Sequence, residues 1–202
     1  AAIYAALQQQ NISYIVPPAS FEEQGQKIRL PGAILEFRMG TCLDLTVLFA
    51  ACAEAAGLHP LVIFIEGHVF PGVWLVEESF AESLQDDPTL LSKRIDPGVQ
   101  EVCVLESTAL TSDSISFDQA VALGEDHLRQ ADEFRFFVDI RRARISQIRP
   151  LPLKSQWETP AADAETVPTS AEPALPVQTA ASAPVPKDWG RPLDDADPAA
   201  AK

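Results

Sequence analysis

The spacing of apolar residues predicts one long, buried helix over residues 42–56. Thr41 supplies an N-cap hydroxyl, and Asp44 three residues later completes an acidic variant of the capping box. Gly57 is placed to end the helix, because glycine readily adopts the left-handed backbone that follows many helices. The apolar positions recur at three- and four-residue intervals, as on one helix face: Leu45, Leu48, Phe49, Cys52 and Ala56.

Four apolar runs after this helix predict β-strands. Residues 61–65 are continuous and β-branched, which is typical of a strand covered on both faces. Residues 68–76 and 102–105 add two further extended runs. Residues 134–140 alternate in polarity, which predicts a strand with one buried face. The residues expected on its buried face are Phe134, Phe136, Val138 and Ile140, and those expected on the other side are Arg135 and Asp139.

A second amphipathic helix is predicted over residues 116–130, opened by a capping box of Ser116 and Gln119. Its expected inner face consists of Phe117, Ala120, Val121 and Leu128. His127 lies in the polar part of this helix, so we expect it to face solvent. The polar residues 77–98 predict a surface excursion that contains a short helix.

Composition divides the chain into two parts. Residues 1–153 carry the predicted elements, which begin with a helix over 1–10 and an extended run over 11–16. Residues 154–202 are dominated by Ala and Pro and have few apolar anchors, which predicts a disordered acidic linker to a further domain. The first residue is alanine and not methionine, so we expect the sequence to be a piece of a longer protein.

Charge and cysteine content narrow the possible functions. The formal net charge of −14 argues against nucleic acid as a partner of this segment, because phosphate binding needs clustered Lys and Arg. No signal peptide is visible, and no apolar run is long enough to span a membrane, which predicts a cytoplasmic protein. Three cysteines without regular spacing are expected to be reduced thiols.

Cys42 is the first candidate for a reactive group. It occupies the predicted first helical position, where the helix dipole stabilises a thiolate. A buried structural cysteine is the alternative interpretation of the same position. His68 lies among apolar residues that would exclude water, whereas His59 precedes a proline in a loop. Glu106 closes the apolar run 102–105 and is the candidate acid that would orient a histidine base.

Three short motifs surround these residues in a fixed order. They are Gly40-Thr41-Cys42-Leu43-Asp44, Gly67-His68-Val69-Phe70 and Glu106-Ser107-Thr108. Their pattern resembles the G-x-C-x-D, G-H-x-[WF] and acid-x-T motifs of the transglutaminase-like superfamily of cysteine enzymes, within the broader papain-like fold. The resemblance covers residues 26–108. It implies an α+β, papain-like fold in which a buried central helix carries Cys42 and packs against an antiparallel sheet.

The same resemblance implies a role for each residue. Cys42 is the nucleophile, His68 the base and Glu106 the orienting acid, at a position where the family usually has Asp. In the family the oxyanion is commonly held by the backbone N–H of the cysteine and by a donor from upstream. Gln26 is the best upstream amide for that purpose, and a plain surface glutamine is the alternative interpretation.

The favoured function is thiol acyl transfer on a protein or peptide substrate, with hydrolysis of a peptide, isopeptide or other amide bond. The alternative is an inactive domain that acts as a protein-interaction module. Residues 20–22 and 136–150 look like bacterial multidomain proteins in which such a domain precedes a helicase-related module. No cofactor is expected. A zinc ion could in principle be coordinated by Cys42, His68, Cys103 and Glu106. However, the sequence has no CxxC or HxxxH pair to support a metal site.

Overall fold

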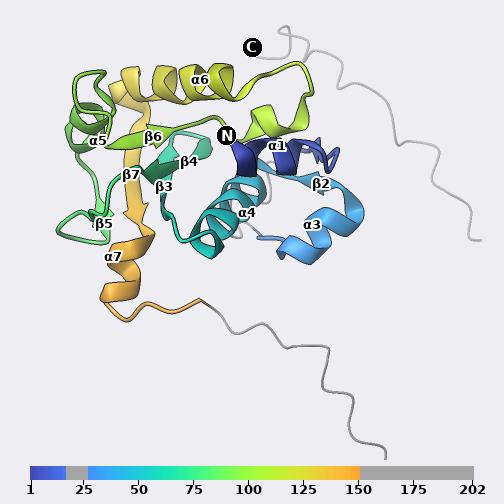
Figure 1. Cartoon of the computed structure of the whole chain (residues 1–202), viewed down its shortest axis with the longest axis horizontal. Coiled ribbons are helices and arrows are strands. Elements are labelled where there is room, and N and C mark those ends of the chain that lie inside the picture. Colours follow the sequence, from blue (N-terminus) through green and yellow to red (C-terminus); the bar gives the residue numbers. More distant parts are fainter. Residues whose placement is uncertain (17–26, 151–202) are drawn as a thin grey trace, which may run out of the picture. The chain divides into compact units, whose positions relative to one another are not determined.

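The described part of the chain is an α+β structure, as predicted. The computed structural model describes residues 1–16 and 27–150, so the predicted linker over 154–202 lies outside the described residues (Figure 1). Its five-stranded sheet is antiparallel, in the order β5-β7-β3-β4-β6. The strands are β3 (His59–Ile65), β4 (His68–Trp74), β5 (Leu84–Gln85), β6 (Val102–Val104) and β7 (Phe134–Asp139).

Six α-helices accompany this sheet in the segments that the structure describes. They are α1 (Ala2–Gln8), α3 (Pro31–Phe37), α4 (Cys42–Ala55), α5 (Pro88–Ile95), α6 (Phe117–Arg129) and α7 (Ile140–Ile145). Two short 3₁₀ turns, η1 (Thr108–Thr111) and η2 (Ala131–Glu133), precede α6 and β7 respectively. Within the same segments, none of the helices is long and apolar enough to cross a membrane.

Helix α4 confirms the central prediction from the sequence. Its capping box is formed in both directions: the Asp44 N–H donates to Thr41 Oγ1 at 3.3 Å, and the Thr41 N–H donates to Asp44 Oδ2 at 3.0 Å. The Arg29 backbone and side chain also donate to Asp44, at 2.7 and 2.8 Å. Burial alone would raise the pKa of Asp44, but these hydrogen bonds hold it below its ordinary value. The carboxylate therefore fixes the start of the helix that begins with Cys42.

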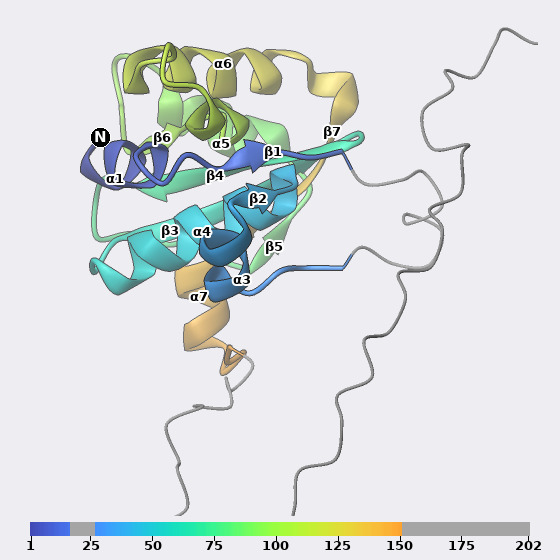
Figure 2. The same cartoon turned by 90° about the vertical axis from the view of Figure 1, so that its right-hand side faces the viewer.

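The sheet separates two layers of side chains. Val62 and Val69 pack on the side of α4, against Ala50. The alternate residues Leu61, Ile63, Phe70 and Trp74 pack against Leu91 of α5 and Leu128 of α6. Strand β4 accordingly runs between α4 and α6 (Figure 2). Because successive side chains of a strand point to opposite faces, His68 shares its side of β4 with Phe70, on the side of α6.

Strand β7 shows where the alternation pattern fails. Its register against β3 shifts between Phe64 and Ile65, so that Phe64 pairs with Phe136 while Ile65 pairs with Phe134. An extra residue in one strand moves the following side chains to the other face. Phe137 and Asp139 are consequently fully buried, which corrects the prediction that Asp139 lies on the outer side. Asp139 accepts hydrogen bonds from the Trp74 indole at 3.1 Å and the Phe80 backbone at 2.8 Å.

A second, two-stranded sheet lies at the N-terminal side of α4. The extended run predicted over 11–16 is shorter than expected, with a strand only at β1 (Ser13–Tyr14). This strand pairs in parallel with β2 (Met39–Gly40), so that Tyr14 is opposite Gly40. The Ile15 N–H continues the ladder by donating to the Gly40 carbonyl at 3.0 Å. The pairing thereby places Tyr14 beside Gly40, which lies two residues before Cys42, the first residue of α4.

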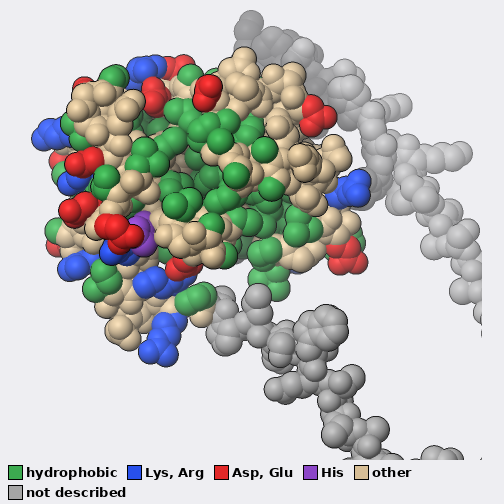
Figure 3. All heavy atoms as spheres, in the orientation of Figure 1, with side chains coloured by type: hydrophobic (Ala, Val, Ile, Leu, Met, Phe, Trp, Pro, Cys, Tyr) green, Lys and Arg blue, Asp and Glu red, His purple; other side chains and the backbone are tan. Residues whose placement is uncertain are grey.

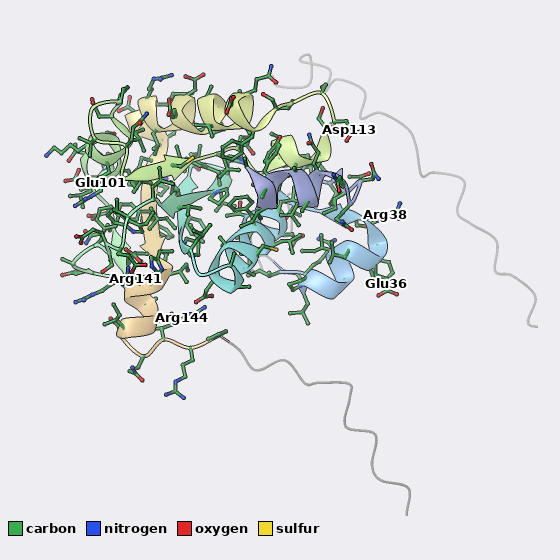
Figure 4. All side chains as sticks on the ribbon, in the orientation of Figure 1. Glu36, Arg38, Glu101, Asp113, Arg141 and Arg144 are labelled. Atoms are coloured by element: carbon green, nitrogen blue, oxygen red, sulfur yellow. The ribbon has the colours of Figure 1, made fainter. Side chains whose placement is uncertain are left out.

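Helix α7 replaces the strand end that the sequence predicts for the basic run. The Asp139 side chain caps the helix by accepting from the Arg142 N–H at 2.9 Å. Arg141 pairs with Glu77 at 3.1 Å and Arg144 with Glu54 at 2.7 Å. Both arginines belong to α7 (Figure 4), and the second pair joins α7 to the C-terminal end of α4, at the opposite end from Cys42. These exposed pairs contribute little to stability and carry no chemistry.

Candidate active site

The structure brings His68 and Glu106 into direct contact. The His68 Nε2 and Glu106 Oε2 atoms are 2.7 Å apart. Strands β4 and β6 are paired neighbours, and the ladder is extended by the Leu105 N–H, which donates to the Pro71 carbonyl at 3.1 Å. Glu106 lies two residues after the end of β6. Because β6 runs antiparallel to β4, this position is near the start of β4, where His68 lies. Only 6% of Glu106 is exposed, so its carboxylate interacts with His68 in a largely dry environment.

Cys42 lies beside this pair, at a cavity of about 290 Å³ that is also lined by Phe64, Gly67 and His68. Burial alone would lower the pKa of His68. Hydrogen bonds to Cys42 and Glu106, together with the negative charges of both groups, outweigh burial and raise that pKa to about 9. Because Nε2 is hydrogen-bonded to Glu106, Nδ1 is the ring nitrogen that remains available to interact with the thiol. His68 therefore connects the predicted nucleophile to the predicted acid.

Glu106 accepts hydrogen bonds at both carboxylate oxygens. Thr108 donates to Oε1 from its backbone N–H and from its hydroxyl, each at 2.7 Å. His68 and His127 both donate to Oε2, at 2.7 and 2.8 Å. Burial would raise the pKa of Glu106, but the hydrogen bonds from His127 and His68, the charge of His68 and the Thr108 bond hold it far below its usual range. The longer side chain of Glu is thus fixed at both oxygens.

The prediction that His127 faces solvent is wrong, because α6 turns that side chain toward Glu106. The helix is fastened to the same strand end: the Glu106 N–H donates to the Ala120 carbonyl at 2.8 Å. Gly124, one turn further, lies so close to Leu105 that a Cβ on it would be 2.7 Å from the Leu105 Cα. His127 follows Ala120 by seven residues, or about two turns, and therefore shares its face. That spacing was the available signal.

Gly124→Ala should destabilise the domain and loosen this arrangement. The added Cβ would meet the backbone of Leu105, which cannot move aside as a flexible side chain could. We expect a loss of about 1–3 kcal/mol in the free energy of unfolding, measured by chemical denaturation. The matched control is Gly32→Ala in α3, where a Cβ meets nothing within 4 Å and stability should be unchanged or slightly higher. Equal stability of both variants would contradict the close packing of α6 on β6.

Tyr14 is a second residue that the sequence did not reveal. Burial is the first cause of a raised pKa at Tyr14, followed by the charges of Cys42 and Glu106 and a hydrogen bond with the Cys42 side chain. The phenol therefore lies next to the thiol, placed there by the β1–β2 pairing. No local pattern could indicate this, because the pairing joins Ser13 to Met39 across 26 positions.

Two other predicted participants are not part of the site described here. Gln26 lies outside the described residues. Cys103 does not join the histidines: it lines a separate apolar cavity of about 360 Å³, together with Phe49, Leu105 and Phe117. Apolar side chains also gather over the middle of the face shown in Figure 3. This larger cavity contains no titratable side chain besides the thiol, so the smaller cavity at Cys42 is the one that chemistry favours.

One group of side chains in the described segments could hold a metal ion. It consists of His68, Glu106 and His127, whose ligand atoms all lie within 4.8 Å of one another. The set differs from the ring considered from the sequence, because His127 takes part and the cysteines do not.

Comparison with protein-family models, with curated proteins and with solved structures found no match for this chain.

Proposed function

We propose that the protein is a cysteine enzyme with a papain-like fold, which transfers the acyl group of an amide substrate through Cys42. The observation that carries the proposal is the chain of contacts from Cys42 to His68 to Glu106. A nucleophile, a base and a group that orients the base are the parts that covalent acyl transfer needs. The raised pKa of His68, about 9, favours an imidazolium next to the sulfur, and such a cation stabilises a thiolate.

In the proposed mechanism the Cys42 thiolate attacks the carbonyl carbon of the bound amide. His68 gives its proton to the leaving nitrogen as the C–N bond breaks, and a thioester forms on Cys42. Water then attacks the thioester, His68 accepts the proton of that water, and the free acid leaves as the thiolate returns. Glu106 keeps Nε2 protonated throughout, which holds the imidazole in one orientation.

Two donors are available for the negative oxygen that develops during attack. Cys42 is the first residue of α4, where backbone N–H groups have no intrahelical partner and the helix dipole is positive. The Tyr14 hydroxyl is the second donor, since it lies next to the thiol. An oxyanion held by a backbone N–H and a side chain gains most where water is excluded. Gln26 stays a prediction for the same role.

The proposed substrate is a protein or peptide, and the proposed reaction is hydrolysis, because water is always present as the second acceptor. The lining of the cavity at Cys42 combines the apolar Phe64, Ile65 and Val69 with the polar side chains of Glu66 and His68. Such a lining suits an extended peptide that places a side chain against apolar residues and its carbonyl near the thiol. A cytoplasmic location and attachment to further domains of a longer chain are part of the same proposal.

Selective labelling of Cys42 tests the proposal. An electrophile such as iodoacetamide should modify Cys42 at least about tenfold faster than Cys52 or Cys103, as read by peptide mass spectrometry. The two other thiols are internal controls, since burial raises the pKa of each. Equal labelling of all three cysteines would contradict an activated nucleophile. That result would favour the alternative, an inactive domain that binds other proteins.

A further inference from the structure

Three potential metal ligands converge on one point beside the proposed catalytic pair. His68 Nε2 and His127 Nε2 are 2.7 and 2.8 Å from the same Glu106 oxygen. The side chains are 19%, 30% and 7% exposed for His68, His127 and Glu106, so the point is sheltered but reachable from solvent. The rings of the two histidines are neighbours, with centroids 5.1 Å apart. Catalysis as proposed uses His68 and Glu106 and leaves the His127 nitrogen without a chemical task.

The three ligands come from rigid elements, which favours a preformed site. His68 begins β4, Glu106 follows β6, and His127 lies in the last turns of α6. The two hydrogen bonds from Thr108 hold Glu106 by its Oε1 atom, so Oε2 is the oxygen that faces both rings. The opening needed is small. Ligand atoms of a tetrahedral site with bonds of about 2.0 Å are about 3.3 Å apart, against the present 2.7 and 2.8 Å.

We propose that His68, Glu106 and His127 form a binding site for a divalent transition metal of the zinc class. Two imidazole nitrogens and one carboxylate oxygen are a donor set that zinc accepts, with water as the fourth ligand. Hard cations such as Mg²⁺ prefer oxygen ligands and should bind poorly.

The consequence for Cys42 rests on the proposed function. A metal bound to His68 Nε2 occupies the nitrogen that otherwise donates to Glu106. The ring can then no longer carry protons on both nitrogens, and it cannot form the imidazolium that stabilises the thiolate. Metal binding should therefore reversibly inhibit the thiol chemistry without contacting the sulfur.

Zinc binding is best measured on the Cys42→Ala protein, which keeps all three ligands and removes the reactive thiol. We expect one Zn²⁺ per chain by calorimetry, with no competition from Mg²⁺. His127→Gln in this background should weaken zinc binding by at least about 10²-fold, because the loss of outer-shell partners alone costs 10- to 100-fold. His59→Gln is the matched control, because His59 lies at the start of β3 beside Glu77 and outside the group.

A spectroscopic readout keeps the test valid if His127→Gln fails to fold. In Cys42→Ala, zinc should shift the imidazole NMR signals of His68 and His127 and leave those of His59 unchanged. In the wild-type protein, zinc should slow the labelling of Cys42, and a chelator should restore it. Absence of zinc binding by Cys42→Ala, or unchanged signals of His68 and His127, would overturn the proposal. An unreactive Cys42 would defeat the proposed function instead, since zinc binding by Cys42→Ala does not depend on it.

Discussion

His68→Ala should slow the alkylation of Cys42 by about 10²-fold near pH 6.5, because the variant lacks the imidazolium next to the thiol. An ordinary thiol, with a pKa of about 8.5, is only about 1% thiolate at that pH, whereas in the proposed mechanism the imidazolium of His68 stabilises the thiolate. The rate in the variant should then rise about tenfold per pH unit, as for a free thiol. His59→Ala is the control and should keep the wild-type pH profile.

The same pair should appear in the pH dependence of stability. The pKa of His68 in the folded protein, about 9, lies above its ordinary value of 6.5. The folded state therefore binds the proton more tightly, so this contribution is fully present below about pH 6.5 and is lost as pH rises through about 9. The difference in unfolding free energy between wild type and His68→Ala should shrink by up to about 3 kcal/mol over that window. A difference independent of pH would contradict an imidazolium in the folded protein.

Local rules were sufficient to predict the elements that begin and end with local signals. Helix α4 and its capping box depend on Thr41, Asp44 and the apolar spacing, all within one turn or a few turns of chain. Helix α6 followed equally from Ser116 and Gln119. The sequence predicted where strand β7 lies, but not which of its side chains are buried. Its bulge arises from pairing with β3, some 70 residues earlier, which the alternation of its own residues does not record.

The site divides along the same line. Cys42, His68 and Glu106 could be named as candidates because each lies in a short motif, and the structure brings them together. Tyr14 and His127 were missed because pairing and packing place them: Tyr14 through a two-residue ladder, and His127 through the docking of α6 on Glu106. The polar residues around His127 predict a side chain that faces solvent, whereas its helical spacing from Ala120 places it on the inner face of α6. The spacing is the criterion that agrees with the structure.

Glu106→Gln should fold like the wild type yet react slowly, with a loss on the order of 10–10³ in the rate of Cys42 acylation. The amide preserves volume and can still accept from Thr108, but its NH₂ group cannot accept the hydrogen bonds that His68 and His127 donate to Oε2. His68 would lose both the preferred tautomer and the charge that stabilises its imidazolium. The corresponding change in serine proteases costs about 10⁴, and a cysteine enzyme should lose less, because a preformed thiolate depends less on proton removal.

The controls are two glutamates outside the site, Glu101 and Glu78. Glu101 pairs with Arg94 and lies near α5 (Figure 4), and Glu78 is exposed. Replacing either by Gln should leave the single-turnover acylation rate unchanged, with circular dichroism confirming the fold of each variant. A wild-type rate for Glu106→Gln together with loss of activity in one control would place the orienting acid elsewhere. If Glu106→Gln unfolds the domain, the carboxylate is first of all structural, joining β6 to α6 through His127, and the inactive interaction module becomes the better account.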